Sequence, residues 1–142
     1  MIINQISVFL ENRKGQLVEI TTALSKNNVD LRAINVVEAT EYGLIRFIVD
    51  DYKKACDVLN EYDFVYRTTP VVVAAVDDKV GGLSNLLNIL KEEDFNIEYM
   101  YSIFSQINHR ALMVFRVNDS DKLENILQGK GYNISIDELG IK

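Results

Sequence analysis

Cysteine, histidine and proline are scarce in this sequence of 142 residues, and long apolar runs are missing. Cys56 is the only cysteine, so the chain cannot form an internal disulfide, which is typical of a protein in a reducing compartment. One cysteine and one histidine, His109, cannot supply the about four ligands of a typical zinc site. The longest apolar run, residues 71–76, is far shorter than the about 20 residues that span a bilayer. Since the N-terminus also lacks the pattern of a signal peptide, we expect a soluble, cytoplasmic protein without a cofactor.

Basic residues are also few, because 15 lysines and arginines stand against 21 acidic residues, for a formal net charge of −6. Nucleic acids and anionic membrane surfaces both require a positive protein face, so the charge argues against either as a partner. Hydrophobic residues make up 48% of the chain and charged residues 25%, which is close to the globular average. The composition therefore predicts a folded protein whose partners are small molecules or other proteins.

The first half of the chain alternates between strand and helix patterns. Leu17, Ile20 and Leu24 share one helical face, and Asp51 has the side chain of a helix N-cap. The turn at Glu41-Tyr42-Gly43 joins two β-branched runs as a hairpin. The elements predicted in order are a strand at 3–10, a helix at 16–27, strands at 29–38 and 44–49, a helix from 51, and a strand at 64–68.

The second half repeats this order after Pro70, which we expect to mark a domain boundary because proline belongs at a strand start or edge. The predicted domains are therefore residues 1–69 and 70–142. With an offset of 66, Gly15 aligns with Gly81 and Leu17 with Leu83. The elements predicted here are a strand at 71–76, a helix at 82–93, a hairpin of 97–105 and 111–117, a short helix capped by Asp119-Ser120-Asp121, and a last strand at 132–136.

Two βαββαβ units indicate an α+β protein of ferredoxin-like topology, with antiparallel sheets and helices on one face. The sequence lacks the residues that several known functions of this topology require. Residues 44–49 do not carry the basic and aromatic signature of an RNA-recognition strand. A metal-carrier domain would need a Cys-x-x-Cys motif, and neither strand–helix junction has the arginine-bearing phosphate loop of an acyl-phosphate hydrolase.

The stretch Asn12-Arg13-Lys14-Gly15-Gln16-Leu17 joins the first predicted strand to the first helix, and Asp78-Lys79-Val80-Gly81-Gly82-Leu83 repeats it. A glycine at such a junction lets the backbone adopt a positive φ and lets a ligand approach the main chain. The first amides of the helix are unpaired at the positive end of the helix dipole, so they can bind a carboxylate.

The first stretch resembles the Asn-Arg-Pro-Gly-x-Leu signature of the ACT domain, a ligand-binding module of many regulated enzymes of amino-acid metabolism. Residues 43–51 are similar to the hairpin strand of that family, and the resemblance covers the whole chain as two copies. The signature proline is replaced by Lys14 in the first copy and by Val80 in the second.

The resemblance implies that the two domains pair through their second strands, 30–38 with 97–105, in one eight-stranded antiparallel sheet. It also implies an amino acid at this seam, between the glycine loop of one domain and the second strand of the other. Neutral amides can both donate to and accept from a zwitterion, whereas carboxylates repel a ligand carboxylate, so we favour the first of two pockets. The favoured pocket combines Asn12, Arg13, Lys14, Gly15, Gln16 and Leu17 with Asn96, and the other combines Asp78, Gly81, Gly82 and Leu83 with Asp30.

These features predict a non-catalytic regulatory protein that binds an amino acid. The sequence shows no pairing of a nucleophile with a base that would support an enzyme. Two alternatives stay open: both loops are simple helix caps and turns, or the chain is an adaptor that docks onto a metabolic enzyme through its sheet without a ligand. Both faces of the second hairpin are apolar, with Tyr101 and Ile103 on one face and Met100 and Phe104 on the other. A face of this kind should be covered, so we expect a homodimer.

Overall fold

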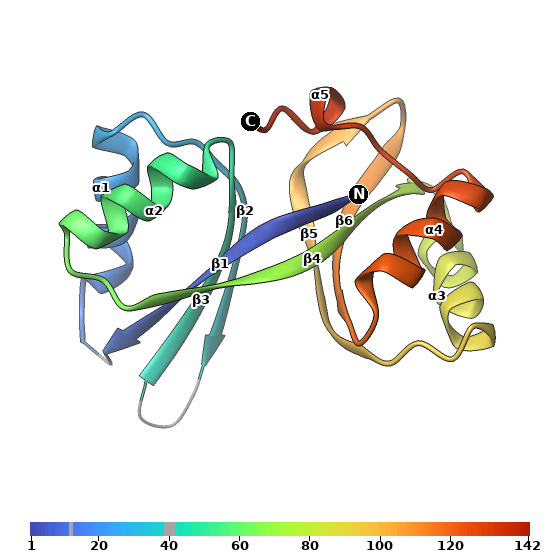
Figure 1. Ribbon diagram of the computed structural model, residues 1–142, viewed down its shortest axis with the longest axis horizontal. Coiled ribbons are helices and arrows are strands. Elements are labelled where there is room, and N and C mark those ends of the chain that lie inside the picture. Colours follow the sequence, from blue (N-terminus) through green and yellow to red (C-terminus); the bar gives the residue numbers. More distant parts are fainter. Residues whose placement is uncertain (12, 39–41) are drawn as a thin grey trace. The chain divides into compact units, whose positions relative to one another are not determined.

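The computed structural model describes residues 1–11, 13–38 and 42–142. The chain divides into two compact units (Figure 1). The unit called here the N-terminal unit holds residues 4–69 and 140–142, and the C-terminal unit holds residues 1–3 and 70–139. No helix in the described part of the chain is both long enough and apolar enough to cross a membrane.

The N-terminal unit builds its core between one face of a sheet and two helices. Its elements are β1 (Ile2–Glu11), α1 (Gln16–Lys26), β2 (Leu31–Glu38), β3 (Tyr42–Val49), α2 (Tyr52–Glu61) and the start of β4 (Tyr66–Asp77). β3 lies between β1 and β2 and is antiparallel to both. Alternate residues of β1, Ile6 and Val8, are buried against Ile20 and Leu24 of α1. Asp51 caps α2, since its carboxylate accepts from the Lys54 N–H at 3.1 Å.

The C-terminal unit repeats this architecture. It contains the rest of β4, α3 (Gly82–Glu92), β5 (Ile97–Ile107), β6 (Arg110–Val117), α4 (Ser120–Lys130) and α5 (Ile136–Leu139). β6 lies between β4 and β5 and is antiparallel to both. Leu86 and Leu90 of α3 pack with Leu123 and Leu127 of α4 and with Phe115 of β6. Asp119 caps α4 as Asp51 caps α2, accepting from the Lys122 N–H at 3.0 Å.

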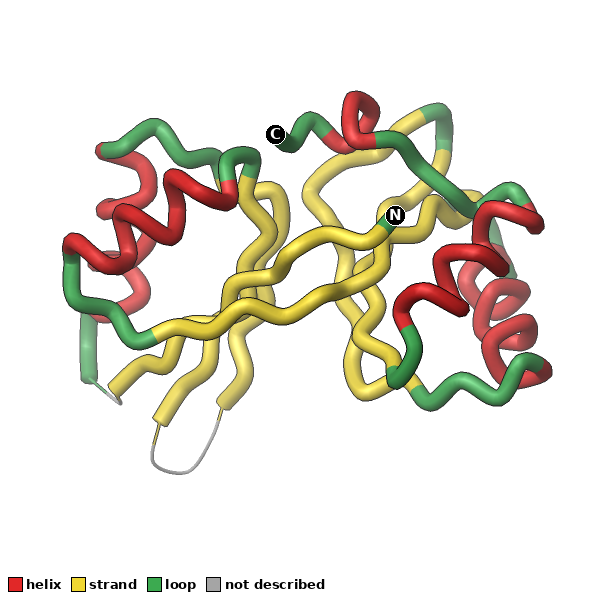
Figure 2. The backbone as a smooth tube through the Cα atoms, in the orientation of Figure 1, coloured by secondary structure: helices red, strands yellow, loops and turns green. Residues whose placement is uncertain are grey.

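The described strands number six, whereas the sequence predicted eight, and their hydrogen-bonded order is β2-β3-β1-β4-β6-β5. One strand is lost because the strands predicted separately at 64–68 and 71–76 fall largely in a single element, β4, which begins at Tyr66 (Figure 2). Proline did not interrupt this strand because a residue before proline, here Thr69, is pushed into extended backbone. Pro70 also precedes Val72, the first residue of β4 in register with β6, so its missing N–H costs no bond in that ladder.

The other missing strand is the one predicted at 132–136. Tyr132 makes one strand-like contact, because its carbonyl accepts from the Ala75 N–H at 2.8 Å. The chain then enters α5, whose N-terminus is fixed by Ser135 and Glu138. The Ser135 N–H donates to Glu138 Oε2 at 2.9 Å and the Glu138 N–H donates to Ser135 Oγ at 3.3 Å, which is the reciprocal arrangement of a capping box. The Ser135 hydroxyl also donates to Glu138 Oε2, at 2.9 Å. The hydrogen bond from the Ser135 backbone and that from its hydroxyl lower the pKa of Glu138.

The predicted pairing of residues 30–38 with 97–105 is also wrong for a single chain. In the described part of the chain β2 pairs only with β3, and β5 pairs only with β6. Both strands therefore have one edge with unpaired backbone groups, which can pair with another chain. On the helix-free face of the second hairpin, Tyr101 and Ile103 of β5 are buried. These two side chains therefore form no open apolar surface, and a homodimer through this face stays a prediction.

Candidate functional site

The two glycine loops have the same backbone geometry. Gly15 has φ 86° and ψ −4°, and Gly81 has φ 84° and ψ −5°. In the first loop the Arg13 N–H donates to the Glu11 carbonyl at 2.8 Å, and in the second the Lys79 N–H donates to the Asp77 carbonyl at 2.9 Å. Both pairs are 66 residues apart, so the sequence repeat is also a repeat of structure.

Each glycine is the N-cap of the helix that follows, α1 or α3, and neither cap makes a side-chain hydrogen bond. The carbonyls of Gly15 and Gly81 accept the first helical bonds, from Glu19 and Asn85 at 3.0 and 2.9 Å. The amides before those positions have no acceptor within their helix. Because a glycine cap supplies no side-chain acceptor, each loop leaves helix amides that can bind an anion. Asn12, the first residue of the favoured pocket, lies outside the described residues.

The cations of the first loop are not equivalent. Arg13 forms a two-pronged ion pair with Glu19, in which both nitrogen–oxygen distances are 2.8 Å. The hydrogen bonds to Glu19 raise the pKa of Arg13, and those from Arg13 lower the pKa of Glu19. Arg13 is thus already engaged within the chain, whereas Lys14 is exposed. Lys14 is the cation better placed to meet a ligand carboxylate.

The second loop carries different side chains. The Asp78 carboxylate accepts from the Gln106 amide at 2.6 Å, and Lys79 lies 3.2 Å from the Asp77 carboxylate. Gly82 has no space for a side chain, because an added Cβ would collide with the Asp77 carbonyl oxygen. Val80, in place of the signature proline, is fully exposed.

Leu17 and Leu83 occupy equivalent places in the first turns of α1 and α3. Leu17 is 40% exposed and Leu83 is 37% exposed. Such leucines next to uncapped amides offer an apolar contact beside an anion site. Together, the backbone amides and the leucine fit a ligand with a carboxylate and an apolar part.

The second-strand residues of the predicted pockets lie just before β5 and β2. Asn96 is exposed in the C-terminal unit. Asp30 belongs to the N-terminal unit, where its N–H donates to the Asp50 carboxylate at 2.8 Å and its own carboxylate lies 3.2 Å from Arg32. The structure thus brings residues 13–17 together in one loop and residues 78–83 in the other.

The sequence missed one feature of the first loop. Gln16 is only 8% exposed, and its Oε1 is buried without a hydrogen-bond donor. A signal was present, because Gln16 is four residues before Ile20 and so falls on the apolar face of α1. Its counterpart in the second loop is Gly82, so this side chain has no equivalent there.

Groups that could support other chemistry are sparse in the described residues. No three histidine, cysteine, aspartate or glutamate side chains there are grouped so that they could hold a metal ion. His109 lies in the hairpin turn between β5 and β6, where it and Asn108 have positive φ values of 59° and 50°. The Cys56 carbonyl accepts a long hydrogen bond of 3.5 Å from Tyr66, and burial raises the pKa of that tyrosine.

Comparisons with known proteins agree with the repeated fold of the two units. A family model described as an ACT domain pair matches residues 1–139. The crystal structure of protein BT0572 from Bacteroides thetaiotaomicron is 35% identical, with a TM-score of 0.89 over 99% of this chain and 96% of that one. No curated protein sequence matches.

Two more distant crystal structures share the fold. The ligand-free regulatory subunit of aspartate kinase from Thermus thermophilus is 12% identical, with a TM-score of 0.60 over 92% of this chain and 95% of that one. Aspartokinase III from E. coli, in complex with lysine and aspartate, is 15% identical, with a TM-score of 0.52 over 91% of this chain and 32% of that one.

Proposed function

Because this chain belongs to the ACT domain pair family, we propose that it is a non-catalytic regulatory protein that binds an amino acid at a glycine loop. The observation that carries the proposal is the pair of matched loops in which a glycine caps a helix without a side-chain acceptor. The free amides of such a helix can bind the carboxylate of an amino acid. Aspartokinase III, which shares the fold, was crystallised with two amino acids, so amino acids are the first ligands to test.

The first loop is the better carboxylate site of the two. Its exposed Lys14 adds a positive charge beside the amides, and Leu17 adds an apolar contact. The second loop places the Asp78 carboxylate at the equivalent of Asn12, where it repels a ligand carboxylate. We propose that the second pocket, with Gly81, Gly82 and Leu83, is degenerate or selects a different ligand.

A second copy of the chain completes the site in this proposal. β2 and β5 are edge strands, so β2 of one copy can pair with β5 of another. This pairing would restore between chains the seam that a single chain lacks. It would place Asn96 of one copy beside the first loop of the other, and Asp30 beside the second loop. A ligand that bridges two copies would favour one assembly state over the other, which is the basis of regulation.

A thermal-shift screen of the full chain against the common amino acids tests the proposal. A ligand present at about 100 times its dissociation constant should stabilise the fold by about 2.7 kcal/mol. We expect at least one amino acid to raise the melting temperature, and amides without a free carboxylate to have no effect. If none raises it, the amino-acid sensor is wrong and the ligand-free adaptor becomes the better interpretation.

Two single substitutions distinguish the loops. Asn12→Ala should abolish the shift, whereas Asp78→Ala should leave it intact, because only the first pocket is proposed to bind. Asn96→Ala should weaken binding and reduce dimerisation measured by light scattering. A shift that disappears with Asp78→Ala and survives Asn12→Ala would move the site to the second loop.

A further inference from the structure

The N-terminal unit contains an open cavity of about 390 Å³ at the end of β1, lined by Glu11 and Gln16 on either side of the first glycine loop. Three segments that are distant in sequence contribute to it: the junction of β1 and α1, the start of β3, and the turn between α2 and β4. All of these segments belong to the N-terminal unit. The lining residues are Phe9, Leu10, Glu11, Gln16, Tyr42, Asp63, Phe64 and Val65.

Gln16 gives this cavity an unused hydrogen-bond acceptor. Its side chain lines the cavity, it is 92% buried, and its Oε1 meets no donor. A buried acceptor without a partner costs free energy, and such groups call for an explanation. Oε1 is shielded from solvent, so a ligand would meet it only after rotation about the last side-chain torsion, which is soft in glutamine. A ligand that carries an N–H donor would satisfy it.

The charged residues of the cavity wall are both acidic. Asp63 lies in a fixed turn, because its N–H donates to the Asn60 carbonyl and the next N–H, of Phe64, donates to the Leu59 carbonyl. Glu11 has a cationic neighbour in Arg13, whose Nε lies 3.6 Å from Glu11 Oε2. That guanidinium is held more closely by Glu19, outside the cavity wall. The two wall carboxylates therefore favour a positively charged ligand.

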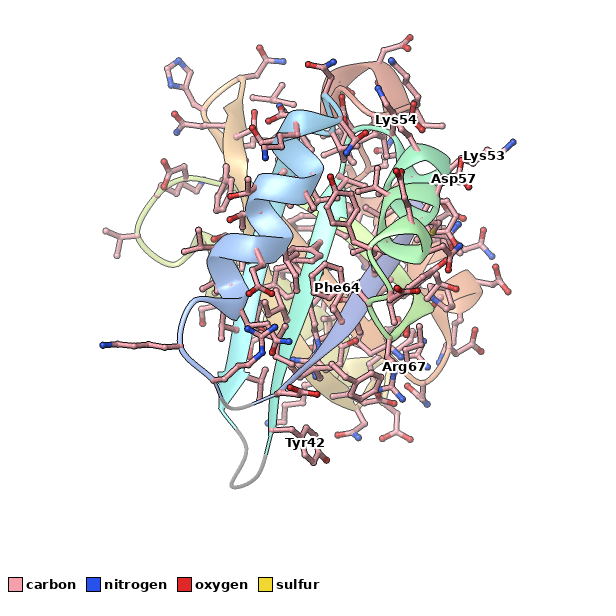
Figure 3. All side chains as sticks on the ribbon, turned by 90° about the vertical axis from the view of Figure 1, so that its left-hand side faces the viewer. Tyr42, Lys53, Lys54, Asp57, Phe64 and Arg67 are labelled. Carbon is pink, nitrogen blue, oxygen red and sulfur yellow. The ribbon has the colours of Figure 1, made fainter. Side chains whose placement is uncertain are left out.

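Aromatic rings complete the wall. Figure 3, which faces the N-terminal unit, shows Phe64 near the two helices and Tyr42 at the lower end of β3. The ring of Phe9 is engaged by a cation of the chain itself, because the Arg67 guanidinium lies 5.7 Å from the ring centroid. Aromatic faces bind organic cations, and the same rings supply apolar contact to the rest of a ligand.

We propose that this cavity binds a small primary ammonium ion with an apolar body. The ammonium N–H groups would donate to Gln16 Oε1 and lie near the Asp63 and Glu11 carboxylates, while the apolar part contacts Phe9 and Phe64. This site goes beyond the amino-acid function proposed above, since it needs neither a ligand carboxylate nor a second copy of the chain. The C-terminal unit cannot repeat it, because Gly82 replaces Gln16.

Calorimetric titration of the full chain at pH 7 with two matched probes tests the inference. Benzylammonium carries the proposed cation on an apolar ring, and benzoate carries a carboxylate on the same ring. We expect benzylammonium to bind and benzoate not to compete with it. If benzoate binds equally well or displaces benzylammonium, the cavity does not select ammonium ions and the proposal is wrong. Absence of benzylammonium binding would overturn it as well.

Substitutions of Gln16 then locate the site. Gln16→Leu keeps the size and removes the acceptor, so it should weaken benzylammonium binding by about tenfold. Gln16→Glu places a carboxylate there and should keep or strengthen binding. Gln128→Leu, on the exposed surface of α4, is the matched control and should change nothing. Unchanged binding by Gln16→Leu, or loss of binding by Gln16→Glu in a protein that melts normally, would contradict the proposal.

One variant separates this inference from the proposed amino-acid function. Asn96→Ala should leave benzylammonium binding unchanged, because the cavity lies within the N-terminal unit. The same variant should weaken the amino-acid response. Loss of benzylammonium binding with Asn96→Ala would place the probe in the amino-acid site and would overturn the separate cavity.

Discussion

The two glycine loops share a backbone and differ in almost every side chain. Their glycines have φ values of 86° and 84°, and the hydrogen bonds donated by Arg13 and Lys79 and those accepted by Gly15 and Gly81 are equivalent. In the second loop the Gly82 N–H also donates to the Lys79 carbonyl, at 3.0 Å. Gln16 in the first loop corresponds to Gly82 in the second, and Glu19, the partner of Arg13, corresponds to Asn85. The repeat thus keeps the backbone at the helix N-terminus in both copies, whereas the side chains around it differ.

This difference separates what the fold requires from what a ligand would require. The positive φ and the uncapped helix belong to the strand–helix junction of either unit, because both copies have them. A buried glutamine acceptor beside two carboxylates belongs to the first copy only. Substitutions at matched positions can therefore test whether structure and recognition are as separate as this comparison indicates.

Gly82→Ala should give the largest effect on stability. The new Cβ would collide with the Asp77 carbonyl oxygen, and backbone must move to relieve the collision. We expect a loss of about 2–3 kcal/mol in the free energy of unfolding, measured in urea. The control is Gly129→Ala in α4, where no atom lies within 4 Å of an added Cβ and φ is not positive. It should stabilise the protein by about 0.5–1 kcal/mol, and a neutral Gly82→Ala would show that the second loop has room for a side chain.

Gly15→Ala and Gly81→Ala should cost about 1–2 kcal/mol each, because an alanine is strained at a positive φ. Neither position has an atom within 4 Å of an added Cβ, so the cost comes from the backbone alone. The two losses should agree within about 0.5 kcal/mol in urea unfolding, since the φ values differ by so little. Asparagine tolerates this conformation better, so Gly15→Asn should lose less than Gly15→Ala. Unequal losses would mean that the two loops differ in backbone as well as in side chains.

Local sequence patterns predicted most of the fold. These patterns join residues that are close together in the chain. They are the helical face of Leu17, Ile20 and Leu24, the caps at Asp51 and Asp119, and the glycine at each strand–helix junction. The family resemblance is confirmed by the match to an ACT domain pair. The fused strand β4 was missed because Pro70 was given the weight of an interruption, although an extended residue before proline continues a strand equally well. At the end of the chain, Ser135 and Glu138 carried a capping-box signal that the strand prediction overlooked.

Contacts between distant segments could not be predicted in the same way. Residues 30–38 were expected to pair with 97–105, but β2 pairs with β3 and β5 with β6, because no local pattern determines which distant strand will be the partner. For the first loop, the positive φ of Gly15 follows from its place between strand and helix. Tyr42 and Asp63, which line the same cavity as Gln16, come from other elements of the unit. The chemistry of the candidate site therefore emerges only with the tertiary structure.

Gln16→Leu should raise the stability of the ligand-free chain by about 1 kcal/mol. The substitution removes a buried acceptor that has no donor and replaces it with an apolar side chain of similar size. Measured by urea unfolding, the gain would show that the chain tolerates a destabilising residue at this position, which is typical of a binding residue. The exposed control Gln128→Leu should stay within about 0.5 kcal/mol of the original. A loss of stability in Gln16→Leu would mean that the Gln16 side chain has a structural role instead.

The Arg13–Glu19 pair, which the second loop lacks, should give the smallest effect. Hydrogen bonds from Arg13 lower the pKa of Glu19 below its ordinary value of 4.5, and both side chains are about half exposed, 49% for Arg13 and 48% for Glu19. A depressed carboxyl pKa contributes stability above the unfolded pKa, and that contribution is lost as the pH falls through the folded value. In an NMR titration, Glu19 should therefore titrate below 4.5 in the original chain and return toward it in Arg13→Gln.

The control for this titration is Lys79→Gln in the second loop, which should leave the Glu19 midpoint unchanged. Raising the salt concentration should reduce the shift, because exposed ion pairs are screened. Should Arg13→Gln leave the midpoint of Glu19 where it was, the pair would not hold Arg13 in place. Arg13 would then be available to a ligand carboxylate, and the contrast between Arg13 and Lys14 in the first loop would disappear.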